Sequence, residues 1–599
     1  MKPVDFGANG INGSVDAQGR IIALNFYHPE HGYVTLTSAD PFPDDQRYNV
    51  AAVRAYRKSL AALEGFGVRF DAPIQSVETH NRYGSTVHTQ INFADDRSAE
   101  VDTFVYGLTT YQRWKSTYGL TARFKGRLSL QRCAYTQITE GGVIPAPPVE
   151  THVTFDQHGK LGMWTIENPA LPAAVCILAP FADDPYEIET VGAVRVDLPL
   201  VGDDVILCFS TGMNALEAQT NALRFYPPTP THLHDAFEEI RLSWWVQRED
   251  DKHRALFEGN LPLERGIVYS QNMAIPVGEG ACLLTDHMLL PLSWNRDAYY
   301  LARALLSWHA DMRDIVRRHL IWMFEIAKRE NGTWGRSYLA NGMIKDASFQ
   351  LDQQVFPLLE LAEYVLETGD RATFQRLEGH VYAILDMLVA RKADFAPLFP
   401  TDETPGDDPI AQPYHLSSHI LFWKTLEKLG RLGVDTGTLK DDIRAAVDRY
   451  FITEGEGKRI YAYATDGKGG HHLYHDANDF PTVLAPIWGW CAADDPVWRA
   501  TMDFAFSPAN EQAWFDGHLG SVHTRAAWSL GDVQDLIVAR ILGDKEREAR
   551  AQAAVRKAAQ RDGALPEAYD PHTYEVVARH WFAWPNAAYA CVLLGAFKP

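Results

Sequence analysis

The chain has 599 residues, 46% of them hydrophobic, which is enough to bury more than one core. Its formal net charge of -21 argues against nucleic acid or anionic membrane as a partner, because both are polyanions that it would repel. The six cysteines are scattered, without a close pair or metal-ligand spacing, so we expect neither a disulfide framework nor a zinc site. Nothing else in the sequence indicates a metal or a cofactor. Neither a signal-peptide core nor a run of about 18 apolar residues is present, which predicts a cytoplasmic location.

Short segments of alternating apolar and polar residues, bounded by Gly, Asp and Pro, occupy the chain up to about residue 230. This period-2 pattern is typical of antiparallel strands in a β-sandwich. Asn49–Leu63 has a helical pattern instead and predicts an insertion. We therefore expect a β-sandwich domain over residues 1–230. The clearest strand segments are Val34–Thr37, Gly84–Phe93, Val101–Tyr106, Arg127–Leu130, Gly192–Leu198 and Asp204–Ser210.

A stiff Pro-rich stretch, Tyr226–Thr231, marks the end of this domain. His234–Phe257 follows as a long, charged and amphipathic segment. It predicts a linker helix over residues 231–260, between the sandwich and whatever follows it.

From residue 261 to 599 the apolar residues recur with the helical period, in about a dozen segments separated by polar or Gly/Pro loops. This number of helices favours an (α/α)6 barrel, with its site in the loops at one end. An irregular helical solenoid would give a similar number, but we find no repeating sequence unit. The chain is therefore expected to be an α+β multidomain protein. The predicted helices are 265–274, 296–309, 313–329, 350–368, 372–391, 415–432, 438–452, 480–491, 496–505, 523–541, 545–560 and 582–596.

Polar motifs stand at the starts of several predicted helices. Arg296 and Asp297 open one helix and could bind neighbouring sugar hydroxyls as donor and acceptor, or form a helix cap with a local salt bridge. Asp352 lies among apolar neighbours, so it is either a ligand contact or a hydrogen-bond partner inside the barrel. The segment Tyr474–Pro481 and the segment Gly517–Thr524 add His, Asp and Asn, but they lack a recognised metal-ligand set such as HExxH.

The loop Phe399–Pro409 contains four carboxylates within seven residues, Asp402, Glu403, Asp407 and Asp408. Such a run is usually a solvated acidic loop. Here Pro and Gly residues restrict the loop, and an apolar helix follows at once. A carboxyl held close to a second carboxylate has a raised pKa, which a proton donor at neutral pH requires.

Near the end of the chain, Ala564–Asp570 places Glu567 after a proline, a short loop before the aromatic segment Trp581–Tyr589. This arrangement should project Glu567 into the mouth of the barrel as a general base, although an exposed loop glutamate is the alternative interpretation.

Six of these elements resemble, in the same order, motifs of the metal-independent exo-α-1,6-mannosidases, glycoside hydrolase family 125. The resemblance covers roughly residues 290–599, and six motifs in one order are more specific than any single motif. The β-rich domain before them instead looks like the sandwich of glucoamylase and glycogen-debranching relatives. The matching elements are Asn295–Ala298, Phe349–Pro357, Pro405–Asp408 with Ser418–His419, His475–Pro481, Gly520–Thr524, and Pro566–Tyr569 with Trp581–Asn586.

The resemblance implies an inverting enzyme on an (α/α)6 barrel. One of Asp407 and Asp408 would protonate the glycosidic oxygen, and Glu567 would deprotonate the attacking water. Ala298 and Gln350 depart from the family's Ser and Glu, so the sugar recognised need not be mannose. The residues implied to hold the terminal sugar are Arg296, Asp297, Asp352, Asn478 and His523, with Trp294, Trp334, Trp514 and Trp584 as aromatic contacts.

The expected function is therefore an exo-acting, inverting α-glycoside hydrolase that releases a terminal neutral sugar of mannose or glucose type from a small glycoside or oligosaccharide. A glycoside phosphorylase is one alternative, but no basic cluster for phosphate is evident near Glu567. A non-catalytic carbohydrate-binding protein would be expected to lose an acid or a base, and both are present. A polysaccharide lyase would act on acidic sugars, which the net charge of -21 disfavours.

Overall fold

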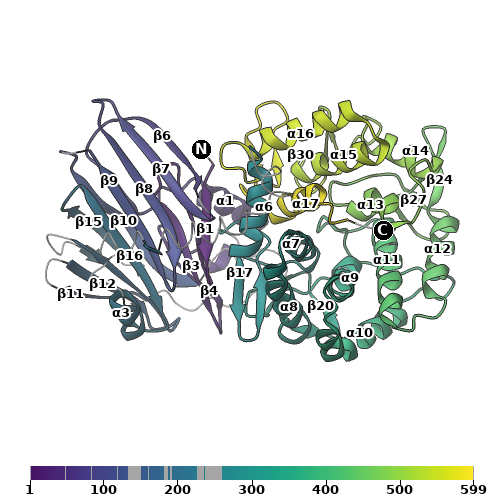
Figure 1. Cartoon of the computed structure of the whole chain (residues 1–599), viewed down its shortest axis with the longest axis horizontal. Helices are drawn as coiled ribbons and strands as arrows, with labels where there is room; N and C mark the ends of the chain where they lie inside the picture. The colour runs from purple at the N-terminus through teal and green to yellow at the C-terminus, as the bar shows by residue number, and fades with distance from the viewer. Residues whose placement is uncertain are drawn as a thin grey trace.

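The computed structural model describes the chain in two halves, β-sheets followed by a ring of helices (Figure 1). The residues it describes are 2–46, 49–82, 84–117, 119–132, 150–158, 161–180, 186–188, 192–224, 235–236, 259–289 and 291–597. Most of the predicted linker helix over 231–260 lies outside these ranges. Within them, no helix is both long enough and apolar enough to cross a membrane.

Two antiparallel sheets form the first half. Among the described residues each has eight strands, and the first follows the order β1-β2-β3-β4-β10-β15-β14, with β5 paired to β10. Its strands are β1 (Val4–Ala8), β2 (Ile11–Val15), β3 (Ile21–His28), β4 (Gly32–Thr37), β5 (Gly67–Phe70), β10 (Ala122–Arg132), β14 (Tyr186–Ile188) and β15 (Val194–Leu200).

The second sheet follows the order β11-β12-β13-β16-β9-β8-β7-β6. One apolar core joins the two sheets, because alternate residues of each strand point inward, Leu24 and Trp114 among them. The register Leu24–Leu36 and Leu36–Leu130 aligns these inward residues across three strands of the first sheet. The strands of the second sheet are β6 (Ile74–Arg82), β7 (Thr86–Phe93), β8 (Ser98–Tyr106), β9 (Thr109–Ser116), β11 (His152–His158), β12 (Leu161–Asn168), β13 (Ala173–Ala179) and β16 (Asp204–Gly212).

Among the described residues of this half, two α-helices lie in its connections. α1 (Val50–Ala61) confirms the predicted insertion, and Asn49 caps it by accepting from the amide of Ala52. α3 (Ala215–Leu223) covers β13 and β16. β13 is therefore buried on both faces, by the sandwich core on one side and by α3 on the other.

Twelve helices of the described residues form two concentric rings, which confirms the (α/α)6 barrel. The inner helices are α7 (Asn295–Trp308), α9 (Leu351–Thr368), α11 (Leu416–Leu432), α13 (Phe480–Trp488), α15 (Ser529–Leu542) and α17 (Ala583–Leu594). The outer helices are α6 (Leu261–Asn272), α8 (Arg313–Ile321), α10 (Arg371–Ala390), α12 (Leu439–Tyr450), α14 (Pro496–Ala505) and α16 (Lys545–Ala559).

Each inner helix contacts the next, and α17 closes the ring against α7. Inner helices are apolar on nearly all sides because both rings cover them, as in α13, where seven of nine residues are buried. Outer helices such as α10, α12 and α16 bury one face only, whereas eight of the twelve residues of α6 are buried. In the helices with one buried face the apolar residues consequently recur with a clear period in the sequence.

Most predicted helix boundaries lie within about four residues of those in the structure, and two of the larger differences have a structural cause. The helix expected over 523–541 begins only at Ser529, because Ala526–Trp528 form the strand β30. The helix expected over 313–329 ends in a π-helical turn at Trp322–Ile326. β30 belongs to a small sheet of five strands, and the sequence pattern predicts none of them. They are β28 (Trp514–Phe515), β29 (His518–Ser521), β30, β31 (Ala568–Tyr569) and β32 (Val576–Ala578).

Candidate active site

A cavity lies at the N-terminal end of the inner helices. Residues at the starts of α7, α13, α15 and α17, and the acidic loop before α11, contribute to it. Seven of the predicted site residues line it together. They are Trp294, Arg296, Asp297, Asp407, Asn478, His523 and Glu567, and Asp286, Pro405, Gly406, Trp528, Arg579 and Phe582 complete the lining.

Arg296, on the first turn of α7, is the central cation of this cavity. Its guanidinium nitrogens lie 3.1 Å from Asp352 Oδ2, 3.5 Å from Asp407 Oδ1 and 3.4 Å from Asp297 Oδ2. Its other face lies over the ring of Trp584, 4.9 Å from the centroid, a cation–π contact. Asp352 and Trp584 therefore support Arg296 from behind and are not among the residues that line the cavity.

Asp407 accepts hydrogen bonds from two sides. Trp294 Nε1 donates to its Oδ2 at 3.1 Å, and Gln350 Nε2 donates to its Oδ1 at 2.8 Å. Burial would raise the pKa of this carboxyl, but the guanidiniums of Arg336 and Arg296 and the Gln350 bond outweigh it and hold the pKa below its usual value. Asp407 is therefore an ionised acceptor, with a left-handed backbone at φ 63°.

Asp408, the next residue, has a different environment. Its Oδ1 lies 3.3 Å from His523 Nδ1. Its Oδ2 is buried and has no hydrogen-bond partner among the described residues. A Cβ at Gly406 would lie 3.4 Å from this oxygen and 3.1 Å from Asn478 Nδ2, so the glycine brings both atoms to the cavity wall. Asp408 thus has one oxygen held and one available.

Asp408 is not itself among the residues that line the cavity, and neither are the other two carboxylates of the acidic loop. Asp402 is exposed. Glu403 accepts 3.0 Å bonds from Arg336 Nη1 and Gln350 Nε2. Burial raises the pKa of Glu403, and the nearby Asp407 adds to this against the effect of Arg336. Buried ion pairs therefore hold this loop in place, and it is not the solvated acidic loop that was the alternative interpretation.

Glu567, 2% exposed, precedes β31 and lines the cavity. Its Oε1 pairs with Arg579 Nη1, whereas its Oε2 makes no hydrogen bond with any described residue. Arg579 Nε lies 2.5 Å from Asp286 Oδ2, and its guanidinium lies 5.9 Å from the centroid of the Trp294 ring. Glu567 is therefore fixed through one oxygen while the other remains available.

Asp297 and Asn478 are two further polar residues that line the cavity. Asp297 is fully buried, and burial together with Asp407 raises its pKa to about 7, although Arg296 opposes this. At neutral pH Asp297 can consequently donate a hydrogen bond as well as accept one. Asn478 Nδ2 donates to Asp476 Oδ1 at 2.6 Å, which orients the amide. Burial and the neighbouring Asp479 raise the pKa of Asp476 to about 6.

Besides Trp584, two more of the predicted aromatic contacts do not line the cavity. Trp334 is fully buried, donates to Met323 O at 3.0 Å and packs against Phe324, so no face of its ring reaches the cavity. Trp514, in β28, is half-buried and does not line the cavity. Trp528 and Phe582 are the aromatic residues that the sequence prediction omitted.

Arg579 and Asp286 are the other omissions. Both lie in loops, separated by almost the full length of the barrel domain. No spacing rule connects such a pair, so sequence patterns alone did not reveal that they meet at Glu567. The opposite charges of Glu567 and Arg579, twelve residues apart, were the one available hint.

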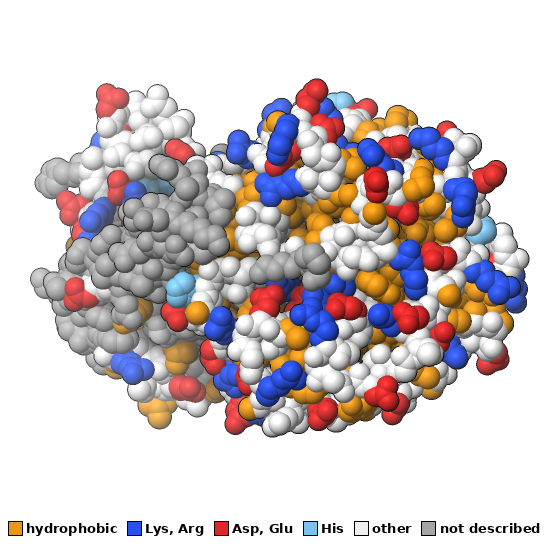
Figure 2. All heavy atoms as spheres, turned by 45° about the vertical axis from the view of Figure 1, so that its right-hand side comes forward, with side chains coloured by type: hydrophobic (Ala, Val, Ile, Leu, Met, Phe, Trp, Pro, Cys, Tyr) orange, Lys and Arg blue, Asp and Glu red, His pale blue; other side chains and the backbone are white. Residues whose placement is uncertain are grey.

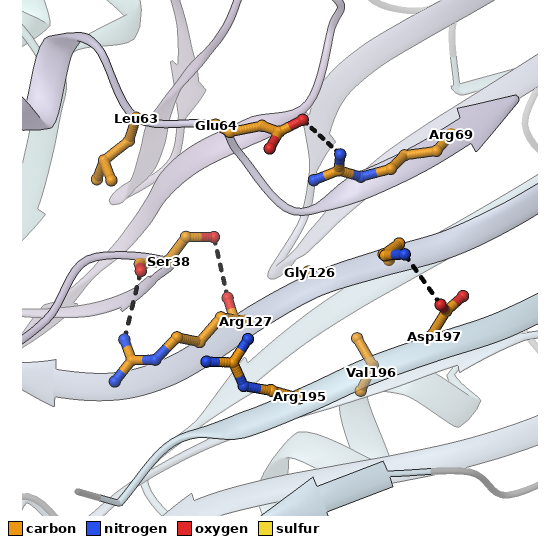
Figure 3. A pocket seen from close by; sticks show the side chains of 10 residues that line it. Ser38, Leu63, Glu64, Arg69, Gly126, Arg127, Arg195, Val196 and Asp197 are labelled. Atoms are coloured by element: carbon orange, nitrogen blue, oxygen red, sulfur yellow. Dashed lines mark hydrogen bonds and ion pairs between the residues drawn. The ribbon is translucent and has the colours of Figure 1, made fainter. Parts of the chain in front are cut away.

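A wider cavity lies on the N-terminal sandwich, over β10 and β15 (Figure 3). Both of its carboxylates are paired with cations: Glu64 with Arg69, and Asp197 with Lys125 at 3.1 Å. No aromatic ring is among its described lining residues. It therefore offers neither a free acid nor a stacking surface, and the barrel cavity is the stronger candidate for catalysis.

Comparison with known proteins agrees with the motif resemblance. Residues 400–594 match the family described as metal-independent alpha-mannosidase (GH125). The chain is 24% identical over 208 residues to the meiotically up-regulated gene 157 protein of Schizosaccharomyces pombe. The match covers 32% of this chain and about 40% of that relative's length.

Two solved structures share the fold. A metal-independent alpha-mannosidase of Streptococcus pneumoniae, in a non-productive complex with alpha-1,6-mannobiose, has a TM-score of 0.52 at 19% identity and covers 59% of this chain and 97% of its own. A bacterial glucoamylase complexed with acarbose has a TM-score of 0.69 at 12% identity and covers 100% of this chain and 94% of its own. The first therefore matches part of this chain, and the second matches its full length. These findings confirm the resemblance and support activity of the glycoside hydrolase type.

Proposed function

We propose that this protein is an exo-acting, inverting α-glycoside hydrolase that releases a terminal neutral sugar of mannose or glucose type. The observation that carries the proposal is Glu567, a buried carboxylate with one oxygen fixed by Arg579 and the other unoccupied, in the cavity that the Asp407–Asp408 loop also borders. An inverting glycosidase needs two carboxyl groups with a water between one of them and the sugar.

Asp408 is the general acid in this mechanism. Asp407 is less suited to donate a proton, because its lowered pKa keeps it ionised and both its oxygens accept hydrogen bonds. Asp408 Oδ2 is buried without a partner, beside Gly406 at the cavity wall. Asp402 is exposed and Glu403 is bound by Arg336, which disfavours both as the acid.

Hydrolysis then proceeds in one displacement. Asp408 transfers its proton to the glycosidic oxygen as the bond from that oxygen to the anomeric carbon breaks. Glu567 Oε2 accepts a proton from a water, and the water oxygen bonds to the anomeric carbon from the opposite face. The product has the inverted configuration, and no covalent intermediate with the enzyme forms.

The remaining residues bind the sugar in this proposal. Arg296, Asp297, Asn478 and His523 present donors and acceptors to its hydroxyls, and Trp294 presents an aromatic edge beside them. Asp352 and Trp584 act through Arg296, which they hold in place. Trp528 and Phe582 are additional candidates for contact with the apolar face of the ring.

Phosphorolysis is the second candidate, because Arg579 is a cation directly beside Glu567. Arg579 is already paired with two carboxylates, Glu567 and Asp286. The lining carries four carboxyl groups against two guanidiniums, which disfavours a phosphate dianion there. On the barrel face shown in Figure 2, acidic and basic side chains are interspersed, without a broad basic patch among its described atoms.

The test is a screen of α-linked mannosides and glucosides, as aryl glycosides and disaccharides, with the product anomer followed by proton NMR. We expect the β-anomer of one sugar to appear first and then to mutarotate. Release of the α-anomer first would contradict inversion. Turnover that requires added inorganic phosphate and yields a sugar phosphate would replace hydrolysis by phosphorolysis.

A further inference from the structure

Asp5, in β1 of the N-terminal sandwich, is a buried carboxylate that bonds to the barrel. It is 1% exposed. Its Oδ1 lies 2.8 Å from His580 Nε2 and accepts a hydrogen bond from Ser14 Oγ. Its Oδ2 accepts a 3.0 Å bond from the amide of Met288. Burying a carboxylate is unfavourable unless such bonds satisfy it, so both oxygens are committed to fixed partners, two of which belong to the barrel.

The two barrel segments that this carboxylate joins carry the partners of the proposed base. The residue before His580 is Arg579, whose guanidinium pairs with Glu567. Met288 lies two residues after Asp286, whose Oδ2 is 2.5 Å from Arg579 Nε. Each of these two hydrogen bonds between the Asp5 carboxylate and the barrel therefore ends one or two residues from a member of this ion-pair group.

The same two segments also contact each other. The rings of His287 and His580 meet edge to face with centroids 4.6 Å apart. Asp286 and Phe582 form an isolated antiparallel bridge. A displacement of one segment would therefore move the other, and the sandwich is bonded to both.

We infer that Asp5 is a positioning residue: the N-terminal sandwich orients the Arg579–Glu567 pair through it. The inference rests on the proposed function, in which Glu567 is the base. A misplacement of about 1 Å in a reacting group can lower a rate on the order of 100-fold. Arg296 lies in α7 and Asn478 in the loop before α13, away from the two segments that Asp5 joins, so loss of Asp5 should affect turnover more than sugar binding.

Asp5→Asn is the direct test, because it keeps the size of the side chain while replacing one acceptor oxygen with an amide. We expect kcat to fall by about 10- to 100-fold while KM changes by less than about 3-fold. Asn341→Ala is the matched control. It removes another bond between the halves, from Asn341 Nδ2 to Pro29 O at 2.9 Å, and should leave both constants unchanged.

A double variant separates positioning from general destabilisation. If Asp5 acts through Glu567, adding Asp5→Asn to Glu567→Gln should produce no further loss of the residual turnover of an activated aryl glycoside. Multiplied losses in the double variant would overturn the inference. So would wild-type kcat in a folded Asp5→Asn protein.

If Asp5→Asn does not fold, His580→Gln is the decisive variant, because it removes the ring from Asp5 Oδ1 and leaves the Met288 bond in place. It should show the same loss of kcat, and wild-type kcat would overturn the inference.

The failure of the proposed function and the failure of this inference give different results. If the Glu567→Gln variant is active, Glu567 is not the base, and the inference about Asp5 is wrong as well. If Glu567→Gln is inactive but Asp5→Asn is fully active, only the inference about Asp5 is wrong.

Discussion

At the scale of single residues, the carboxyl groups of the barrel cavity differ because their partners differ. Asp407 receives two hydrogen bonds and faces two guanidiniums, which lower its pKa. Asp297 is fully buried, and burial together with the nearby Asp407 raises its pKa to about 7 against the effect of Arg296. One residue type therefore supplies both an ionised acceptor and a group that carries a proton near neutrality.

Replacing Glu567 with Gln should lower kcat by about 10²- to 10⁴-fold with little change in KM, because the amide binds sugar but cannot accept the proton of water. Steady-state kinetics on the preferred glycoside would measure this. Added azide should restore turnover and give the inverted glycosyl azide. Glu575→Gln, at an exposed glutamate of the same loop region, is the control. Near wild-type turnover in Glu567→Gln would contradict the assignment.

Asp408→Asn and Asp407→Asn should differ in their dependence on the leaving group. Loss of the acid should cost about 10²- to 10⁴-fold on a disaccharide and far less on an activated aryl glycoside, whose leaving group needs no proton. Asp407→Asn should instead raise KM for both substrates, because it weakens the contacts with Trp294 and Arg296. The opposite pattern in kinetics on the two substrates would make Asp407 the acid.

Asp297 should make the folded protein less stable as the pH rises. Its pKa is raised from 3.8 to about 7, so the folded state retains a proton that the unfolded state releases. Stability is therefore lost from about pH 4 up to about pH 7 and is constant beyond that. Asp297→Asn mimics the protonated form of the side chain. The Tm of this variant minus the Tm of wild type should therefore be larger at pH 8 than at pH 5. Parallel pH profiles of Tm in the two proteins would contradict this.

At the scale of elements, the rings of the barrel pack closely where glycine allows it. A Cβ at Gly266, in α6, would lie 2.5 Å from the carbonyl oxygen of Asn586 in α17. Gly266→Ala should therefore force the helices apart and lower the free energy of unfolding by about 1–3 kcal/mol. Urea denaturation would measure this change.

Gly379→Ala is the matched control for this prediction. Gly379 lies in the middle of α10, and a Cβ there would meet nothing within 4 Å. Alanine in a helix interior is favoured over glycine by up to about 1 kcal/mol, so this variant should be neutral or more stable. A Gly266→Ala protein as stable as wild type would show that α6 can move away without cost.

The sequence predicts the elements unevenly, for a physical reason. Helices with one buried face have a clear period, and all twelve barrel helices lie close to their predicted positions. β13 was not predicted, because burial on both faces removes the alternation that marks a strand. The strands β28–β32 are two to four residues long, and their pairing depends on loops that meet only in the folded barrel.

The candidate site follows the same division. Residues in motifs at helix starts, such as Arg296 and Asn478, were predictable because each belongs to a local pattern. Arg579 and Asp286 were not, because their role depends on which loops the barrel brings together. The placement of Trp334 in the core was likewise undetermined, since an aromatic residue before a helix suits either burial or stacking.

At the scale of the whole molecule, the first and last parts of the chain meet beside the site. Lys2 Nζ lies 2.7 Å from Asp562 Oδ1, and Asp5 meets His580. These pairs are separated by 560 and 575 residues of chain. Figure 1 shows the N-terminus between the sandwich and the C-terminal helices.

Contacts between such distant residues impose an order on assembly. During synthesis the amino-terminal strand must wait for nearly the whole chain before it finds His580, and long-range contacts of this kind form slowly. We therefore expect enzymatic competence to be the last property acquired. On dilution from denaturant, the far-ultraviolet helical signal should recover before turnover does, and simultaneous recovery would contradict this order. A nascent chain would then carry a nearly finished barrel that cannot yet cleave any glycoside.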